Sequence, residues 1–186
     1  MKTVIAFLTV AVFVPSVSFG QSEKHELRMS LDDTFVVKES EKWSIAVEKL
    51  LELRFANVKI LPKKNHSFSL MLYFKCDTSD LAQYDTPQKM ERALKSSSEK
   101  YLSNAVETKV DIKKLTFKGR YGFSTVLTDK ELANQTTIPA GQFKYITRGM
   151  IRLSPDSALG FSLMTNSLDS TEYKELMDYI ASFVKE

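Results

Sequence analysis

Three pairs of segments with alternating apolar residues constrain the fold of this chain more than any other feature. In each pair, two stretches with apolar residues at every second position flank a short polar break. A period of two is typical of strands that bury one face, and a short break between two such strands predicts a hairpin. The pairs are residues 55–60 with 67–76, residues 110–117 with 121–127, and residues 143–153 with 159–163.

Two other segments repeat their apolar residues at helical spacing. The first, residues 87–106, begins with a proline directly behind Thr86, a favourable N-cap. The second segment covers residues 170–184. At its start, Asp169 and Glu172 are spaced as a capping pair. We therefore predict one long helix in the middle of the chain and one helix at its end.

The N-terminal part has a weaker pattern. Residues 34–37 predict a short first strand, and the polar residues 21–33 predict a flexible arm before it. The apolar residues within 43–53 are compatible with either a strand or one face of a helix. The alternation of Trp43, Ile45 and Val47 favours a strand.

The order of these elements predicts an α+β fold. It consists of an antiparallel β-sheet on which a long middle helix and a C-terminal helix pack as in a sandwich. The chain has no internal repeat and no linker-like segment. Residues 34–186 are therefore expected to form a single α+β domain. A domain of this length is of ordinary size and can bury one hydrophobic core.

Residues 1–20 have the organisation of a secretory signal peptide. A positive charge at Lys2 precedes an apolar run over residues 4–14, and small residues lead to a cleavage site after Gly20. The run is shorter than the roughly 20 residues that span a bilayer. We expect cleavage and export to a bacterial periplasm or the medium as a monomer that does not span the membrane. An uncleaved N-terminal anchor is the alternative.

Cys76 is the only cysteine of the chain. In an oxidising compartment a single thiol indicates either a disulfide to another chain or a buried, inert side chain. Cys76 ends the alternating apolar run that begins at Phe68. This position favours burial, because buried thiols behave as small apolar side chains.

The residue sets of common catalytic and metal sites are missing from the sequence. The two histidines, His25 and His66, fall in the arm and in a hairpin turn, where neither is expected to assist a nucleophile. One cysteine and two distant histidines do not make a zinc site. The acidic run over residues 77–85 lacks the central glycine of an EF-hand loop. We predict no catalytic, metal or cofactor residues, although a pair of carboxylates in a hydrolase stays open because their separation is a three-dimensional property.

The charges of the chain nearly balance, with 26 Lys and Arg against 23 Asp and Glu. So small an excess is not typical of a nucleic-acid-binding protein. On one predicted strand, however, Lys144, Arg148 and Arg152 share a face, with successive cations about 13 Å apart. They form either a surface for an anion or an acidic partner, or a solvated face whose long side chains cover Ile146 and Met150.

The C-terminal run GFSLMTNSLDSTEYKELMDYIASFV contains a strand, a short capped connection and a closing helix. This run is similar to the end of the PsbP-like superfamily. Trp43, the hairpin after it, the helix from Pro87 and the strand around Gly122 follow in the order expected for that group. The resemblance covers most of the chain as a pattern of elements. It implies a helix–sheet–helix sandwich with a non-enzymatic adaptor or assembly role, and it supplies no catalytic residues or metal contacts to transfer.

Three functions are compatible with these observations. The leading hypothesis is an exported non-catalytic domain that binds a protein or cell-envelope partner. The second is a carboxylate-dependent hydrolase. The third is a carrier of a small apolar ligand held between sheet and helix. Four residues would line its cavity or, alternatively, pack in the hydrophobic core: Met71, Phe74, Met90 and Met177.

Overall fold

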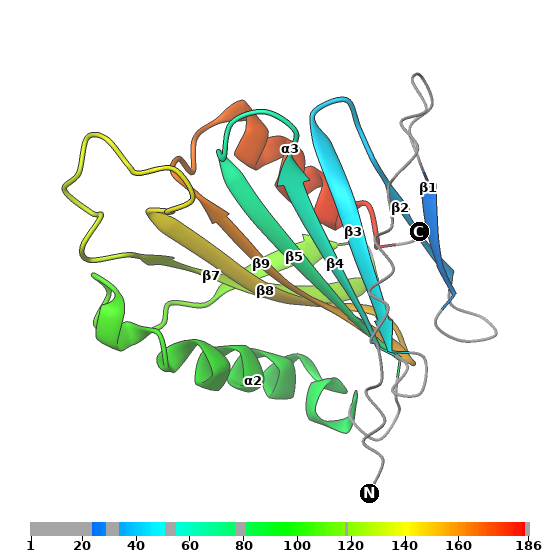
Figure 1. Cartoon of the computed structure of the whole chain (residues 1–186). Helices are drawn as coiled ribbons and strands as arrows, with labels where there is room; N and C mark the ends of the chain where they lie inside the picture. Colours follow the sequence, from blue (N-terminus) through cyan, green and yellow to red (C-terminus); the bar gives the residue numbers. More distant parts are fainter. Residues whose placement is uncertain (1–23, 29–33, 51–54, 77–80, 118, 185–186) are drawn as a thin grey trace, which may run out of the picture.

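The computed structural model describes residues 24–28, 34–50, 55–76, 81–117 and 119–184. Its strands are β1 (Lys24–Arg28), β2 (Thr34–Lys38), β3 (Trp43–Leu50), β4 (Phe55–Pro62), β5 (Phe68–Lys75), β6 (Lys113–Phe117), β7 (Arg120–Thr128), β8 (Tyr145–Ser154) and β9 (Ser157–Thr165). Seven of them form one antiparallel sheet in the order β3-β4-β5-β9-β8-β7-β6 (Figure 1). The remaining two, β1 and β2, form a separate antiparallel sheet.

The three predicted hairpins are confirmed as β4–β5, β6–β7 and β8–β9. The strand interpretation of the segment from Trp43 is confirmed as well, because β3 pairs with β4 along its whole length. Residues 51–53 of that prediction lie outside the described residues. The strand β9 returns to the middle of the sheet and pairs with β5, so that Leu72 lies opposite Phe161. This pairing joins the N-terminal and C-terminal halves of the sheet.

Helix α2 (Pro87–Glu99) begins as predicted, with the side chain of Thr86 accepting a hydrogen bond from the backbone N–H of Lys89 at 3.2 Å. It ends about two turns earlier than predicted, and the chain continues into a short 3₁₀ helix, η3 (Leu102–Asn104). Three successive serines at residues 96–98 explain the early end, because serine is a weaker helix former than the alanine, leucine and lysine before it.

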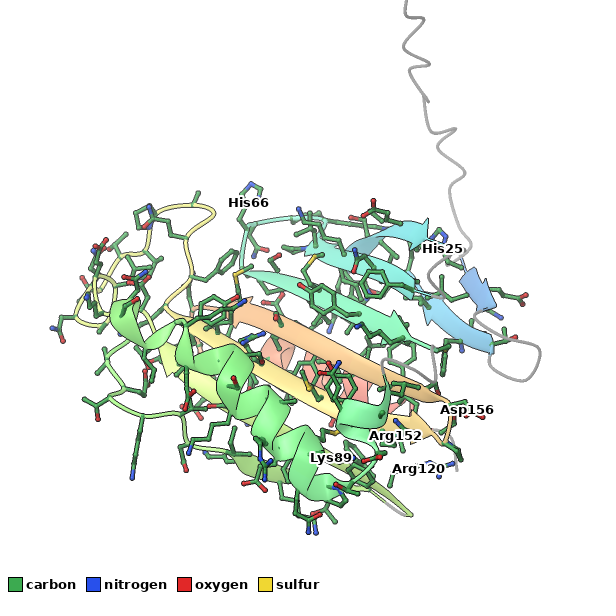
Figure 2. All side chains as sticks on the ribbon, turned by 90° about the horizontal axis from the view of Figure 1, so that it is seen from below. His25, His66, Lys89, Arg120, Arg152 and Asp156 are labelled. Carbon is green, nitrogen blue, oxygen red and sulfur yellow. The ribbon has the colours of Figure 1, made fainter. Side chains whose placement is uncertain are left out.

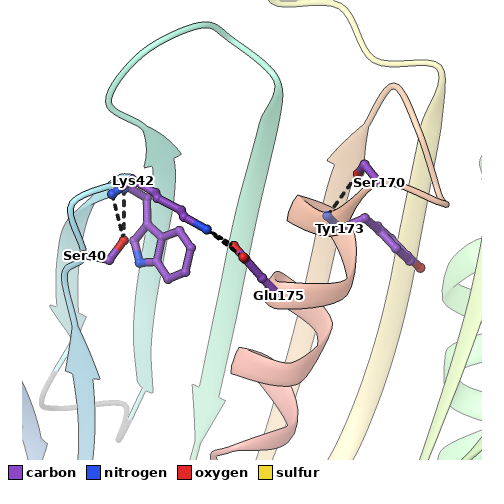
Figure 3. Close-up of polar contacts among 6 residues, drawn as sticks. Ser40, Lys42, Ser170, Tyr173 and Glu175 are labelled. Atoms are coloured by element: carbon purple, nitrogen blue, oxygen red, sulfur yellow. Dashed lines mark hydrogen bonds and ion pairs between the residues drawn. The ribbon is translucent and has the colours of Figure 1, made fainter.

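Helix α3 (Thr171–Ala181) confirms the predicted closing helix. Its N-cap is Ser170 and not the predicted Asp169. The side chain of Ser170 accepts a hydrogen bond from the backbone N–H of Tyr173 at 3.1 Å (Figure 3).

The predicted α+β class is wrong, because the protein is mostly β. Strands hold 46% of the described residues and helices 22%, so the helices are additions to a sheet-dominated fold. The expectation of a flexible arm over residues 21–33 does not hold for residues 24–28, which form β1. There Leu27 is fully buried and the backbone pairs with β2. A single apolar residue in a polar segment gives no alternating pattern, so the sequence did not predict this strand. The strand is stabilised by its pairing with β2.

The large sheet has one helix on each face (Figure 1). Helix α3 and the two-stranded sheet cover one face, where Phe74 belongs to the main core. Its ring stacks on Phe35 at 5.0 Å and meets Phe183 edge-to-face at 5.2 Å between ring centroids. Lys42 and Glu175 add an ion pair of 2.6 Å at the edge of this layer (Figure 3). The Lys42 side chain is 61% exposed, so the pair contributes little to stability. Apolar packing therefore holds this layer together.

The burial predicted for Cys76 is confirmed, since the residue is 2% exposed within the main core. We expect a thiol reagent to label the native protein slowly and the protein in denaturant quickly, because only unfolding brings the sulfur to solvent. Mass spectrometry of timed samples measures both rates. Immediate labelling of the native protein, or a disulfide-linked dimer on a non-reducing gel, would contradict this prediction.

Candidate functional site

Helix α2 covers only part of its face of the sheet. It contacts β7 and β8, where Met90 and Leu94 are buried against Phe123. A short 3₁₀ helix, η2 (Ala82–Tyr84), precedes α2 and is fixed by a hydrogen bond of 2.9 Å from the hydroxyl of Tyr121 to the carbonyl of Tyr84. Burial raises the pKa of Tyr121, as does the negative charge of Asp85, while Arg152 opposes the shift. The neutral hydroxyl that donates this bond is thereby favoured.

Beside this contact lies a cavity of about 280 Å³, which we call the α2 cavity. Its walls come from η2 and α2 on one side and from strands β4, β5, β8 and β9 on the other. The residues that line it are Phe55, Tyr73, Lys75, Tyr84, Met90, Leu94, Arg148, Gly149, Met150, Ala158, Leu159, Gly160, Phe161 and Ser162.

Gly160 keeps the sheet side of the α2 cavity open. It lies between Tyr73 of β5 and Met150 of β8 in the register of the sheet. A Cβ atom at Gly160 would be 3.6 Å from the Cβ of Tyr73, which is ordinary van der Waals contact. The space above this position is therefore not needed for packing, and a larger side chain there would project into the cavity.

The polar side chains among the described residues that line the α2 cavity are few. They are Tyr73, Lys75, Tyr84, Arg148 and Ser162, and none of the described lining residues is Asp or Glu. A carboxylate pair of the kind that a hydrolase uses is therefore not found among the described residues of this cavity.

Arg148 lies between β8 and the end of α2. Its Nη1 donates to the carbonyl of Ser97 at 2.6 Å and to the hydroxyl of Ser98 at 3.0 Å, and its guanidinium lies 4.8 Å from the ring centroid of Tyr101. A cation at this end stabilises the last carbonyls of the helix. All three contacts are to neutral groups. The Nε of Arg148 is buried and has no hydrogen-bond partner within the described residues.

The three cations predicted to form a row have different surroundings. The Nζ of Lys144 lies 5.8 Å from the ring centroid of Tyr145, and Lys144 borders a second cavity of about 180 Å³ near η3. Arg152 donates to the carbonyl of Pro155. Figure 2 shows Arg152 beside the β8–β9 turn that holds Asp156. Only Arg148 of the three lines the α2 cavity. A common surface for an anion or an acidic partner stays a prediction.

The two histidines lie apart, His25 on β1 and His66 in the β4–β5 turn (Figure 2). Within the described residues, no group of three or more His, Cys, Asp and Glu side chains is placed to hold a metal ion. Residues 77–80 of the acidic run lie outside the described residues.

Sequence reasoning placed only part of this site. Of the four residues proposed to line a ligand cavity, Met90 does so, whereas Phe74 and Met177 belong to the core under α3 and Met71 is not among the lining residues. Most other lining residues were missed, among them Tyr73 and Phe55. Both stand on the supposed solvent face of alternating strands, and large aromatic side chains at such positions were the available signal.

Comparison of the chain with models of known protein families and with curated proteins finds no match. The resemblance to the PsbP-like superfamily therefore stays a prediction. None of the described helices is both long enough and apolar enough to cross a membrane.

Proposed function

We propose that this protein is an exported, non-catalytic domain that binds a small apolar ligand in the α2 cavity. One observation carries the proposal: a cavity of about 280 Å³ lies between sheet and helix, with mostly apolar walls and a few polar groups. This composition is typical of small-molecule sites, whose volumes start at about 300 Å³. The size suits a compact or narrow ligand.

A surface groove that binds nothing is the alternative explanation of such a space, because the α2 cavity is partly open to solvent. Here a larger side chain at Gly160 would fill the space without a steric conflict at its Cβ. The chain carries a glycine instead, which supports use of the space by a ligand.

The carrier is one of three functions that the sequence allowed, and the α2 cavity is a specific observation in its favour. Binding of a protein or envelope partner stays a prediction without a surface assigned to it. Export is proposed from the pattern of residues 1–20, which lie outside the described residues.

Titration of the purified protein with the apolar dye N-phenylnaphthylamine tests the proposal. We expect saturable fluorescence enhancement with one dye per chain, since the cavity shields the dye from water. Gly160→Leu places a branched side chain in the cavity and should weaken binding by about tenfold or more, which corresponds to about 1.4 kcal/mol.

Ala46→Leu is the matched control, because it adds the same side chain at an exposed position of β3 outside the cavity. It should bind the dye as the wild type does. Denaturant melts establish that both variants are folded. Absence of saturable binding, or equal binding by the Gly160→Leu and Ala46→Leu variants, would refute the proposed function.

A further inference from the structure

The second cavity, of about 180 Å³ near η3, has a different lining from the α2 cavity, and we call it the η3 cavity. We infer that it binds one ring of a neutral sugar, which packs on aromatic side chains and forms hydrogen bonds with the polar residues around them. Its volume is below the about 300 Å³ at which sites for drug-sized ligands begin, so it suits a ligand no larger than one ring. This inference is independent of the proposed function of the α2 cavity.

The first argument is the exposed aromatic surface. Tyr101, Phe143 and Tyr145 line the η3 cavity. Tyr101 is 38% exposed, more than any other aromatic side chain among the described residues. Apolar surface that gathers around a hollow marks a binding site. The C–H groups on the face of a sugar ring pack well on aromatic rings, because their positive edge meets the negative face of the π-system.

The second argument is the set of polar groups beside these rings. Asn104 offers an amide, Asp129 a carboxylate and Lys144 an ammonium group, so that donors and acceptors are both present. Asn104 is an exposed residue. The Oδ2 of Asp129 and the Nζ of Lys144 are not among the buried side-chain atoms that lack a hydrogen-bond partner. Because neither forms a hydrogen bond within the described residues, both are accessible to a ligand.

The third argument is that the charges at the η3 cavity disfavour an ionic ligand. An anion beside Lys144 would also meet the carboxylate of Asp129. Cations already lie near two of the rings, Lys144 at 5.8 Å from the ring centroid of Tyr145 and Arg148 at 4.8 Å from that of Tyr101. Like charges at such distances oppose the binding of a further ion.

A purely apolar ligand fits the η3 cavity no better, because it would remove water from the polar groups without replacing the hydrogen bonds. A sugar ring meets both requirements. It is neutral and has an apolar face, and each of its hydroxyl groups donates and accepts a hydrogen bond as a serine hydroxyl does.

The fourth argument is preorganisation. The backbone N–H of Asp129 donates to the carbonyl of Lys144 at 2.8 Å. The N–H of Lys130 donates to the carbonyl of Asn104 at 3.1 Å, which ties η3 to the end of β7. The Oδ1 of Asp129 accepts a hydrogen bond from the N–H of Glu131 at 2.8 Å, so the carboxylate is held in place. Walls that are already ordered lose little entropy on binding.

Saturation-transfer NMR of the purified protein with the methyl glycosides of glucose, galactose and N-acetylglucosamine tests the inference. We expect at least one of them to bind saturably with a Kd on the order of 1 mM, the strength that a ring of about 12 non-hydrogen atoms reaches at ordinary ligand efficiency. Transfer should be strongest to the C–H protons on one face of the ring. Sorbitol has the hydroxyl groups without the ring face, and it should not bind.

Tyr101→Leu removes an aromatic ring from the η3 cavity, and Asn104→Ala removes the amide. Each should weaken sugar binding about fivefold or more. Asn134→Ala is the matched control for Asn104→Ala, because Asn134 is also an exposed asparagine and lies outside both cavities. It should bind as the wild type does. Denaturant melts establish that the three variants are folded.

The inference is wrong if none of the three glycosides binds, if sorbitol binds as tightly as they do, or if Tyr101→Leu and Asn104→Ala both bind as the wild type does. Phenylalanine is the competing probe, since Asp129 and Lys144 would pair with the two charges of a zwitterion. Tighter binding of phenylalanine than of every glycoside would overturn the assignment of a neutral sugar.

Gly160→Leu separates this inference from the proposed function. The variant narrows the α2 cavity and leaves the η3 cavity unchanged, so it should lose dye binding and keep sugar binding. Loss of sugar binding in folded Gly160→Leu would place the sugar in the α2 cavity and overturn the assignment to the η3 cavity. Absence of dye binding by the wild type refutes the proposed function alone.

Discussion

Replacing Ile180 by alanine is expected to lower the free energy of unfolding by about 2–5 kcal/mol. Ile180 is 1% exposed and belongs to the core between α3 and the sheet. A helix as short as α3 is marginal in water without tertiary packing, so its buried stripe is what keeps it folded. A loss of this size is a large part of the about 5–15 kcal/mol by which domains are usually stable.

Urea or guanidinium melts followed by circular dichroism measure the effect. Lys174→Ala is the control, because Lys174 lies on the exposed side of the same helix. It should change stability by less than about 0.5 kcal/mol. If Ile180→Ala unfolds at the wild-type midpoint, α3 does not depend on this contact, and the core described under it is incorrect.

The strands and helices with a strong local period could be predicted from the sequence. The three hairpins follow from alternation, and the start of α2 follows from Thr86 and Pro87. Two parts were predicted wrongly. The strand around Leu27 has no local period and depends on its pairing with the next strand, β2. Helix α2 ends early at the three serines of residues 96–98, where Arg148 donates to the carbonyl of Ser97. The missed strand β1 and the shortened helix α2 both raise the share of strand, so the expected α+β fold is a mostly β one.

The candidate site was harder to predict because it forms where distant segments meet. The pairing of β5 with β9 brings Tyr73 opposite Gly160, and no local pattern predicts that register. The alternation did place Arg148 on the correct face of its strand. Its contacts depend on α2, because Arg148 donates to Ser97 and Ser98 near the end of that helix. The row of cations in the sequence gave no indication of these contacts.

The sheet contains a pair of glycines whose replacement by alanine should have opposite consequences. A Cβ atom at Gly149 would lie 2.2 Å from Cζ of Phe161 and 2.8 Å from the carbonyl oxygen of Phe123. Phe161 is 2% exposed, so its ring has no free space to enter, and the carbonyl belongs to the neighbouring strand. Overpacking of this kind costs typically about 1–3 kcal/mol. We expect Gly149→Ala to lower the free energy of unfolding by about 3 kcal/mol.

Gly160→Ala is the matched control, made one strand away and towards the opposite face. Its Cβ meets the side chain of Tyr73 at 3.6 Å and the carbonyl oxygen of Gly149 at 4.0 Å, which are ordinary contact distances. Alanine restricts the unfolded chain more than glycine does, so stability should stay within about 0.5 kcal/mol of the wild type or rise by up to about 1 kcal/mol. The same denaturant melts compare the two variants. Equal stability of both would mean that Phe161 does not fill the space beside Gly149. The separation between the packed face under α3 and the open face under α2, on which the assignment of the α2 cavity depends, would then be wrong.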